Sequence, residues 1–444
     1  MIFGMVSLGC PKNQVDGEMI MAGLAARGWS LTSDPGRADV IVINTCGFIQ
    51  SAKEESIEQI MDMARYKTEG GCRYLIATGC LAQRYPRELA EKIPELDGIV
   101  GIAACRRLPA IMDRIINGER VVETSPLSLR EGYAPRLIST AFYSAYLKIA
   151  DGCDNRCAYC IIPEIRGPFR SKPKEDVLHE ASELAENGVK ELILIAQDTS
   201  RYGMDLYGRP FLVDLLYELQ QIKGLHWIRL LYLHPAHLDR RLIEAARDLP
   251  KIVKYLDLPL QHASGAILRS MNRPGSGESY LDMIKEIKEA VPGIFIRSTF
   301  IVGFPGETEE DFRILVSFLE KARLDRAGFF KFSREEGTPA YVMKPHVSLR
   351  VKERRFNEIS ALQRSISREL LRERVGREME ALITGYRKDG FVLGRTEGDA
   401  PGIDGLLYLA DFPCSAGEFY RVKITGSTDY DLMGKALYKI EIKR

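Results

Sequence analysis

The chain has 444 residues, of which 45% are hydrophobic and 28% are charged, and its formal net charge is +1. This length exceeds what one hydrophobic core usually holds, so we expect roughly two to four domains. The near-neutral charge argues against a strongly basic nucleic-acid-binding protein, and no apolar run approaches the roughly 18 residues of a membrane span.

The first residues, Met1 to Gly9, form a short apolar run without a basic leader or a small-residue cleavage site. They therefore predict a β-strand rather than a signal peptide. The nine cysteines are spread along the chain and odd in number. Without a secretory signal, this pattern favours a cytoplasmic location, in which thiols serve as metal ligands rather than forming disulfides.

Predicted strands and helices alternate through residues 1–123, which indicates βαβ units and an open parallel α/β sheet. Residues 124–140 contain prolines and a glycine without periodicity and are interpreted as a linker. The predicted strands are Phe3–Leu8, Val40–Asn44, Tyr74–Thr78 and Gly98–Val100, and the helices between them include Val15–Arg27 and Ala52–Tyr66.

Three cysteines of this first domain stand just past the ends of predicted strands, each beside a glycine. Because the carboxyl ends of parallel strands lie side by side and bind ligands, these thiols are expected to converge. A single such cysteine would be interpreted as a buried structural residue. Three at equivalent positions predict an iron–sulfur cluster, with the glycines letting the backbone approach it. The cysteines are Cys10, Cys46 and Cys80, whereas Cys72, Cys105 and Cys414 lack this placement and are interpreted as structural.

The alternation resumes in residues 141–345, where six βα repeats predict a partial (β/α)6 barrel with its site at the carboxyl ends of the strands. The predicted strands are Tyr146–Ala150, Glu191–Ala196, Trp227–Tyr232, Tyr255–Leu258, Phe295–Val302 and Gly328–Phe332.

The most informative motif, Cys153-x3-Cys157-x2-Cys160, directly follows the first strand of this predicted barrel. Four-iron clusters are usually held by four thiolates, and only three are close together here. Such a cluster would keep one iron open to bind a substrate or cofactor. A structural zinc site is the alternative, but it requires four closed ligands, and His179 is the nearest downstream histidine.

Further candidates for cofactor binding accompany the second strand and the cysteine run. Tyr159, between the last two cysteines, could lie against an adenine ring, with core packing as the alternative reading. Gln197 and Asp198 end the second strand at the functional face and could hold a small polar ligand.

The fifth predicted strand and the turn after it supply three more candidates. Arg297 lies within this strand, where an arginine is costly unless a carboxylate or a ligand pairs with it. Gly303 and Phe304 belong to the turn Val302-Gly-Phe-Pro-Gly-Glu-Thr, whose position favours ligand contact over a simple turn. His262 is equally compatible with a loop role and a functional one, and His234 and His237 are interpreted as structural.

The last part of the chain contains a helix and a β-rich segment. Residues 346–375 are highly charged with apolar residues three or four apart, which predicts a connecting helix with one packed stripe. Residues 376–444 are rich in β-branched and aromatic residues and carry turn signals such as Asp389-Gly390. They predict a small five-stranded barrel of the OB type.

Together these motifs resemble a radical S-adenosylmethionine (SAM) enzyme, because Cys153-x3-Cys157-x2-Cys160 with an aromatic residue before the last cysteine is similar to that superfamily's cluster loop. The first-domain cysteines and the small C-terminal barrel narrow the resemblance to the methylthiotransferases, in which that barrel is called a TRAM domain. The resemblance covers nearly the whole chain. It implies SAM and two [4Fe-4S] clusters as cofactors, with the six motif cysteines as ligands.

Two branches of this family differ in substrate. The RimO branch modifies an aspartate of the small-subunit ribosomal protein uS12, and the MiaB branch modifies an isopentenylated adenosine in tRNA. The segments Gly9-Cys-Pro-Lys-Asn, Ala196-Gln-Asp-Thr-Ser-Arg-Tyr-Gly and Asp257-Leu-Pro-Leu-Gln-His resemble the RimO branch. From Gly376 onward there are ten Lys or Arg and eleven Asp or Glu, a balance that suits a basic protein partner better than RNA.

The resemblance also implies the chemistry and the partners. One SAM is cleaved at the Cys153 cluster to a radical that takes a hydrogen from the aspartate β-carbon; the second cluster supplies sulfur, and a second SAM methylates it. The expected partners are the ribosomal protein, bound through the TRAM domain, and an electron donor such as flavodoxin or ferredoxin, with neither tRNA nor a membrane. A tRNA methylthiotransferase of the MiaB type and a non-enzymatic, metal-containing RNA-binding factor stay open as alternatives.

Overall fold

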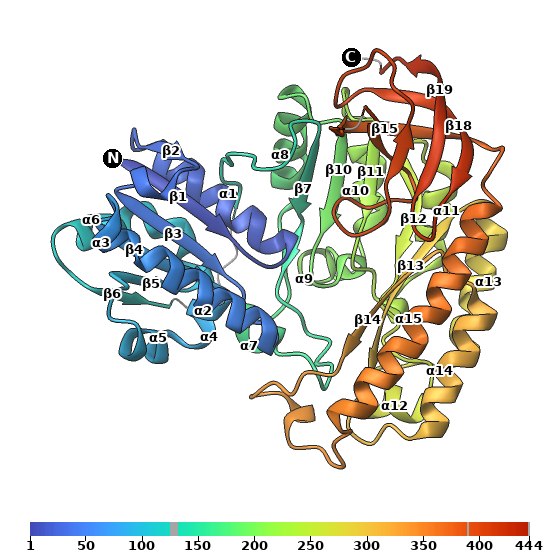
Figure 1. Ribbon diagram of the computed structural model, residues 1–444, viewed down its shortest axis with the longest axis horizontal. Helices are drawn as coiled ribbons and strands as arrows, with labels where there is room; N and C mark the ends of the chain where they lie inside the picture. Colours follow the sequence, from blue (N-terminus) through green and yellow to red (C-terminus); the bar gives the residue numbers. More distant parts are fainter. Residues whose placement is uncertain (125–131, 389, 443–444) are drawn as a thin grey trace.

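The computed structural model describes residues 1–124, 132–388 and 390–442. They form an N-terminal sheet, a central six-stranded sheet and a C-terminal closed barrel, so the predicted fold class is confirmed in all three parts (Figure 1). Within the described ranges, no helix is both long and apolar enough to cross a membrane. Residues 125–131 of the predicted linker lie outside the described residues, as do Asp389 of the predicted hairpin turn and residues 443–444.

The N-terminal sheet has the strand order β2-β1-β3-β4-β5-β6, and every neighbouring pair is parallel. Its central strands are almost wholly buried, because helices cover both faces of a parallel sheet. The two edge strands, β2 and β6, have three residues each, are partly exposed and were not predicted, whereas the equally short but fully buried β5 was. The strands are β1 (Ile2–Ser7), β2 (Ser30–Thr32), β3 (Val40–Thr45), β4 (Tyr74–Gly79), β5 (Gly98–Val100) and β6 (Val121–Glu123).

Helix α1 (Pro11–Ala25) lies between the N-terminal sheet and the central one (Figure 1). Ile20 and Leu24 pack on its own sheet, whereas Val15 and Met19 join an apolar cluster with the other two domains. The helix begins four residues before the predicted Val15, because a proline at the first position is already compatible with helical geometry. The other helices here are α2 (Gln50–Ala64), α3 (Tyr66–Glu69), α4 (Cys80–Arg84), α5 (Pro86–Lys92) and α6 (Leu108–Ile116).

The central sheet has the parallel order β14-β13-β12-β11-β10-β7, which is an open (β/α)6 barrel as predicted. Its strands are β7 (Ser144–Lys148), β10 (Glu191–Ile195), β11 (Trp227–Leu230), β12 (Ile252–Asp257), β13 (Phe295–Val302) and β14 (Arg326–Lys331). The short strands β8 (Ala150–Asp151) and β9 (Arg170–Ser171) pair beside it. Its helices are α7 (Ile162–Arg166), α8 (Lys174–Glu186), α9 (Met204–Tyr207), α10 (Leu212–Leu219), α11 (Arg240–Asp248), α12 (Gly265–Ser270), α13 (Gly277–Ala290) and α14 (Glu309–Ala322).

Helix α15 (Leu349–Arg372) runs beside α14 and leads into the C-terminal barrel (Figure 1). Ile359 and Ile366 on its buried stripe join the core of the central domain, as the predicted spacing implies. The barrel closes in the order β15-β16-β17-β19-β18. Its strands are β15 (Glu378–Tyr386), β16 (Val392–Thr396), β17 (Leu407–Leu409), β18 (Phe419–Ser427) and β19 (Leu432–Ile440).

A buried ion cluster joins the C-terminal barrel to the central sheet. Glu191 on β10 accepts hydrogen bonds from Arg229 Nε at 3.1 Å and from both Nη atoms of Arg395 on β16. Burial alone raises the pKa of Glu191, but Arg395 and Arg229 outweigh it and lower that pKa to about 2. The carboxylate is therefore needed to neutralise two buried arginines at this interface.

We expect Glu191→Gln to lower the free energy of unfolding by about 3–5 kcal/mol, because it leaves the arginines buried without an anion. Since the folded pKa lies below the ordinary value of 4.5, the stabilisation from Glu191 is complete above that pH and is lost as the pH falls toward 2. Denaturant unfolding at pH 7 measures the effect, with Glu186→Gln on the exposed face of α8 as the control. Equal stability of the two variants would contradict the conclusion that Glu191 neutralises the two buried arginines.

Candidate functional site

The three cysteines of the N-terminal domain follow three adjacent strands. Cys10 precedes α1 just after β1, Cys46 follows β3 directly, and Cys80 is the first residue of α4 after β4. A Cβ atom added at Gly9 would lie 2.9 Å from Cys46 Cβ and 3.0 Å from its Sγ, so the Cys10 loop touches Cys46. Cys80 in turn interacts electrostatically with both other thiols. The structure therefore brings Cys10, Cys46 and Cys80 together at one edge of the sheet.

Glycines permit this convergence. Gly79 has a φ of +92°, in the region that favours glycine, and it turns the chain directly from β4 into the helix that starts at Cys80. A Cβ at Gly47 would lie 2.9 Å from the backbone of Leu81, so the loop after β3 presses against the start of α4. Larger residues at either position would push the thiol-bearing segments apart.

The second set of thiols lies in the loop after β8. Cys157 interacts electrostatically with both Cys153 and Cys160, and Arg273 Nη1 lies 3.6 Å from Cys157 Sγ. The loop is closed by a hydrogen bond from Cys153 N to Gly167 O at 3.1 Å. Cys153, Cys157 and Cys160 therefore form a second group of three.

The two groups fit clusters better than single metal ions. Burial raises the pKa of Cys80 and of Cys160 to about 12, so both thiols need a nearby positive centre to ionise. One tetrahedral zinc, with zinc–sulfur bonds of about 2.3 Å, would draw its sulfurs to within about 3.8 Å of one another. Among the described residues, neither trio has all its sulfur atoms within 4.8 Å of one another. Wider spacing suits thiolates bound to different irons of one cluster.

The remaining cysteines lie outside both groups, as expected. Cys72 and Cys105 are buried in two separate apolar cores of the N-terminal domain, and Cys414 belongs to the C-terminal barrel. Neither group thus gains a fourth thiol from them.

Arg166, at the end of α7, links the two groups of thiols. Its Nη2 lies 2.9 Å from both Asn13 Oδ1 and Asp16 Oδ2 on α1 and 3.7 Å from Cys80 Sγ, while its Nη1 lies 3.0 Å from Asp151 Oδ2. Ile161 and Ile165, which follow Cys160 closely, pack against Cys80. The groups are therefore neighbours across one short helix.

Sequence reasoning missed Arg166 and its partners on α1. The signal was present: polar Asn13 and Asp16 begin a helix directly after Cys10, where an apolar face would otherwise be expected, and both are buried. Lys148 on β7 also bonds to Asp16. Only the docking of α1 onto the central domain explains why these side chains are polar.

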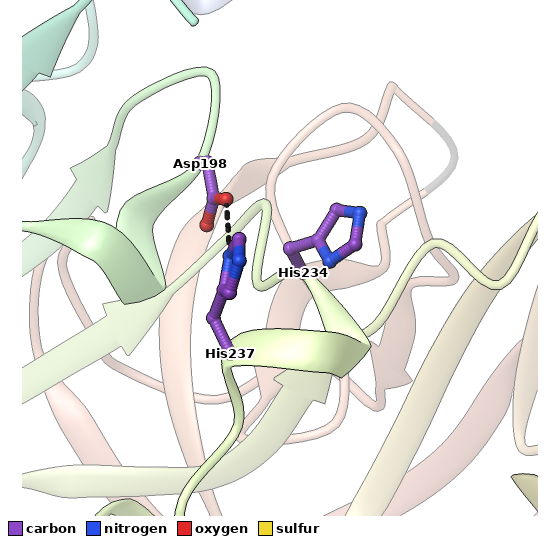
Figure 2. Close-up of side chains that lie close together, drawn as sticks. All are labelled: Asp198, His234 and His237. Carbon is purple, nitrogen blue, oxygen red and sulfur yellow. Dashed lines mark hydrogen bonds and ion pairs between the residues drawn. The ribbon is translucent and has the colours of Figure 1, made fainter. Parts of the chain in front are cut away.

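Asp198, His234 and His237 lie together at the mouth of the barrel, with ligand atoms within 4.8 Å of one another (Figure 2). Asp198 Oδ2 accepts hydrogen bonds from His237 Nδ1 at 2.8 Å and from Asn155 Nδ2 at 2.7 Å. Burial lowers the pKa of His234 to about 3, so its ring is neutral. Because Asn155 lies inside the cysteine loop, this network holds the loop against the end of β10. A SAM contact by Asp198 stays a prediction.

The other predicted cofactor contacts near the cysteine loop are one polar side chain with a free acceptor and two side chains in an apolar cluster. Gln197 donates to Asp151 Oδ1 at 2.9 Å, while its buried Oε1 has no partner among the described residues and is available to a ligand donor. Tyr159 and Phe304 belong to one apolar cluster beside the cysteine loop. Both the packing role and the contact role predicted for Tyr159 are compatible with this position.

Protein carboxylates already neutralise Arg297. Its Nη1 lies 3.0 Å from Asp257 Oδ1, and its Nε lies 3.4 Å from Asp404 Oδ1 in the C-terminal barrel. The negatively charged partner that buried Arg297 requires is therefore supplied by the protein itself and not by a ligand. Gly303, with a φ of +75°, and Phe304 both donate their N–H groups to Glu307, which orders the turn after β13.

A cavity of about 420 Å³ opens beside Cys10. Residues from all three parts of the chain line it, among them Cys10 itself, Tyr146 on β7 and Pro401–Ile403 of the C-terminal barrel. The cavity therefore leads to Cys10, the first thiol of this group.

Three protein families match successive parts of the chain: "Uncharacterized protein family UPF0004" at residues 3–101, the radical SAM superfamily at 147–319 and the TRAM domain at 375–437. Among solved structures, the radical SAM methyltransferase TsrM from Kitasatospora setae, with cobalamin and a [4Fe-4S] cluster bound, aligns over 90% of this chain and 81% of its own. The TM-score is 0.57 at 14% identity, which shows a shared fold.

Curated relatives match over nearly the full length. The "Ribosomal protein uS12 methylthiotransferase RimO" of Pelotomaculum thermopropionicum is 49% identical over 98% of this chain and 99% of its own length. The protein of the same name from Desulforudis audaxviator is also 49% identical, over 98% and 96%. On this evidence the chain belongs to the RimO family of radical SAM methylthiotransferases.

Proposed function

We propose that the protein inserts a methylthio group at the β-carbon of an aspartate in ribosomal protein uS12. The proposal is supported chiefly by two neighbouring groups on either side of Arg166, each with three thiols and no fourth among the described residues. Cys153, Cys157 and Cys160 would hold one [4Fe-4S] cluster, and Cys10, Cys46 and Cys80 the other. When bound, the clusters and SAM supply the radical that removes a hydrogen, the sulfur atom and the methyl group.

The chain's own residues then position and shield the reacting groups. Asp198 and Asn155 fix the cysteine loop, and the free Oε1 of Gln197 is an acceptor for a polar group of SAM. Arg166 holds α1 and the cysteine loop at a constant separation through Asp16 and Asp151. Cys80 and Cys157 are 4% and 8% exposed, so one thiol of each group is shielded from water, whereas Cys10, Cys153 and Cys160 are partly exposed.

The partners are part of the same proposal. The loop Pro401–Ile403 lines the cavity beside Cys10, which supports a substrate protein held partly by the C-terminal barrel. The near-balanced charge of that barrel favours a basic protein over tRNA. We also propose an electron donor of the flavodoxin or ferredoxin type and, because the substrate is ribosomal, a cytoplasmic location.

The test is anaerobic incubation of the reconstituted protein with SAM, dithionite and a peptide that carries the target aspartate. We expect mass spectrometry to show the gain of one methylthio group on that aspartate. Isopentenylated tRNA, incubated in parallel, is expected to stay unchanged. Modification of the tRNA instead of the peptide would establish the MiaB-type alternative, and colourless protein without SAM turnover would establish the non-enzymatic one.

A further inference from the structure

Lys12, in the first turn of α1, is a buried cation that has no counter-ion among the residues the structure describes. Its side chain belongs to a residue that is only 7% exposed, and its Nζ lies 3.0 Å from the centre of the Tyr232 ring. Among the described residues, no carboxylate lies within 4 Å of this ammonium group, and it donates no hydrogen bond to any of them. An aromatic face offsets only part of the cost of burying a charge.

The other buried cations in this region differ from Lys12, because each has an acidic partner or an acceptor. Arg166 and Lys148 share Asp16 and Asp151, and Arg297 pairs with Asp257. The two carboxylates that interact with Lys12 at longer range, Asp257 and Asp151, are thus held by other cations. Lys12 alone in this set keeps its full capacity to bind an anion.

Lys12 also lies where the proposed reaction requires the substrate. It interacts electrostatically with Cys10 of the first thiol group, while Tyr232, just past β11, belongs to the mouth of the barrel. Tyr232 has a φ of +63°, unfavourable for a bulky residue, and a hydrogen bond from its N–H to Asp257 Oδ2 at 3.0 Å holds it there. The Tyr232 hydroxyl makes no hydrogen bond within the part of the chain that the structure describes.

We propose that Lys12, backed by the Tyr232 ring, is the binding site for the side-chain carboxylate of the substrate aspartate. This inference rests on the proposed function. In aspartate the carboxylate carbon is bonded directly to the β-carbon, so anchoring the carboxylate places the reacting carbon within one bond of a fixed point. A charge-assisted hydrogen bond in a nearly dry site also discriminates strongly against a neutral amide.

The experiment compares binding of two peptides to the reconstituted protein under anaerobic conditions, one with the target aspartate and one with asparagine in its place. We expect Lys12→Met to weaken binding of the aspartate peptide about 10- to 100-fold and to change binding of the asparagine peptide less than about twofold. Lys12→Arg should keep the preference for aspartate, because it keeps the charge. Lys92→Met, at the exposed end of α5, is the matched control.

The rival role for Lys12 is to stabilise the neighbouring metal centre or the helix. In that case Lys12→Met would lose iron, measured chemically, or would weaken both peptides equally, and either result overturns the proposal. Unchanged affinity of Lys12→Met for the aspartate peptide overturns it as well, even though the wild-type protein still modifies that peptide. If the wild-type protein does not bind the aspartate peptide at all, the proposed function fails and this inference fails with it.

Discussion

Replacing Cys153 with alanine will abolish reductive cleavage of SAM. The group Cys153, Cys157 and Cys160 contains three thiols only, and the loop that carries them is fastened at Gly167 and Asp198 rather than by any further cysteine. A four-iron cluster usually has four thiolate ligands, and this loop supplies three. The two that remain after the substitution are too few to retain the cluster. We expect 5′-deoxyadenosine formation under dithionite to fall to background and the iron content to fall by about half.

The control for this experiment is Cys72→Ala. Cys72 is also buried, but it lies in an apolar core of the N-terminal domain, and its Sγ donates to Tyr74 O at 3.4 Å. Its loss should cost about 1 kcal/mol of stability and leave SAM cleavage intact. Background cleavage in both variants would mean that folding, not ligation, was disturbed, and full cleavage by Cys153→Ala would refute the assignment of the loop.

Replacing Cys46 with alanine will separate the two halves of the proposed reaction. Cys46 belongs to the N-terminal group, and the hydrogen bonds that fasten the Cys153 loop, among them those to Asp198, Gly167 and Arg273, do not involve Cys46. SAM cleavage should therefore continue, while transfer of the methylthio group should stop for lack of its sulfur source. The two products, 5′-deoxyadenosine and modified peptide, are measured in the same reaction.

A wild-type yield of modified peptide from Cys46→Ala would show that the N-terminal thiols do not supply sulfur. Loss of SAM cleavage in this variant would show instead that the two groups are coupled through Arg166, which contacts Cys80 on one side and Asp151 on the other. Iron analysis shows how many clusters were lost, because each group of thiols accounts for half of the metal.

Most strands of the N-terminal and central sheets could be predicted from the pattern of apolar residues along the chain. The strand β13 was predicted at its observed bounds, and the six central strands were all located, because strand-like segments alternate with helical patterns along this part of the chain. The three-residue strands β2 and β6 were missed, because pairing with neighbours, not their own pattern, makes them strands.

The ligand cysteines could be proposed for a similar reason. A Cys-x3-Cys-x2-Cys run is local, and residues that end adjacent parallel strands meet at one edge whatever the loops do. The SAM contacts were harder, because they depend on which acceptors the fold leaves unsatisfied. The sequence required a carboxylate or a ligand to pair with Arg297, and only the folded chain supplies the carboxylates, Asp257 and Asp404. The free Oε1 of Gln197 likewise became visible only in the folded chain.

By itself, then, the sequence determined the order of the three folded parts, the two trios of thiols and the family, since each of these is written in local patterns or in identity along the chain. The tertiary structure alone decided that Arg166 joins the trios, that Glu191 joins the C-terminal barrel to the central sheet and that Lys12 meets no carboxylate among the described residues. These charged side chains come from segments that are distant in the sequence, so their pairing is not visible in local patterns. Because they are buried, each ion pair, or its absence, has a large effect on free energy.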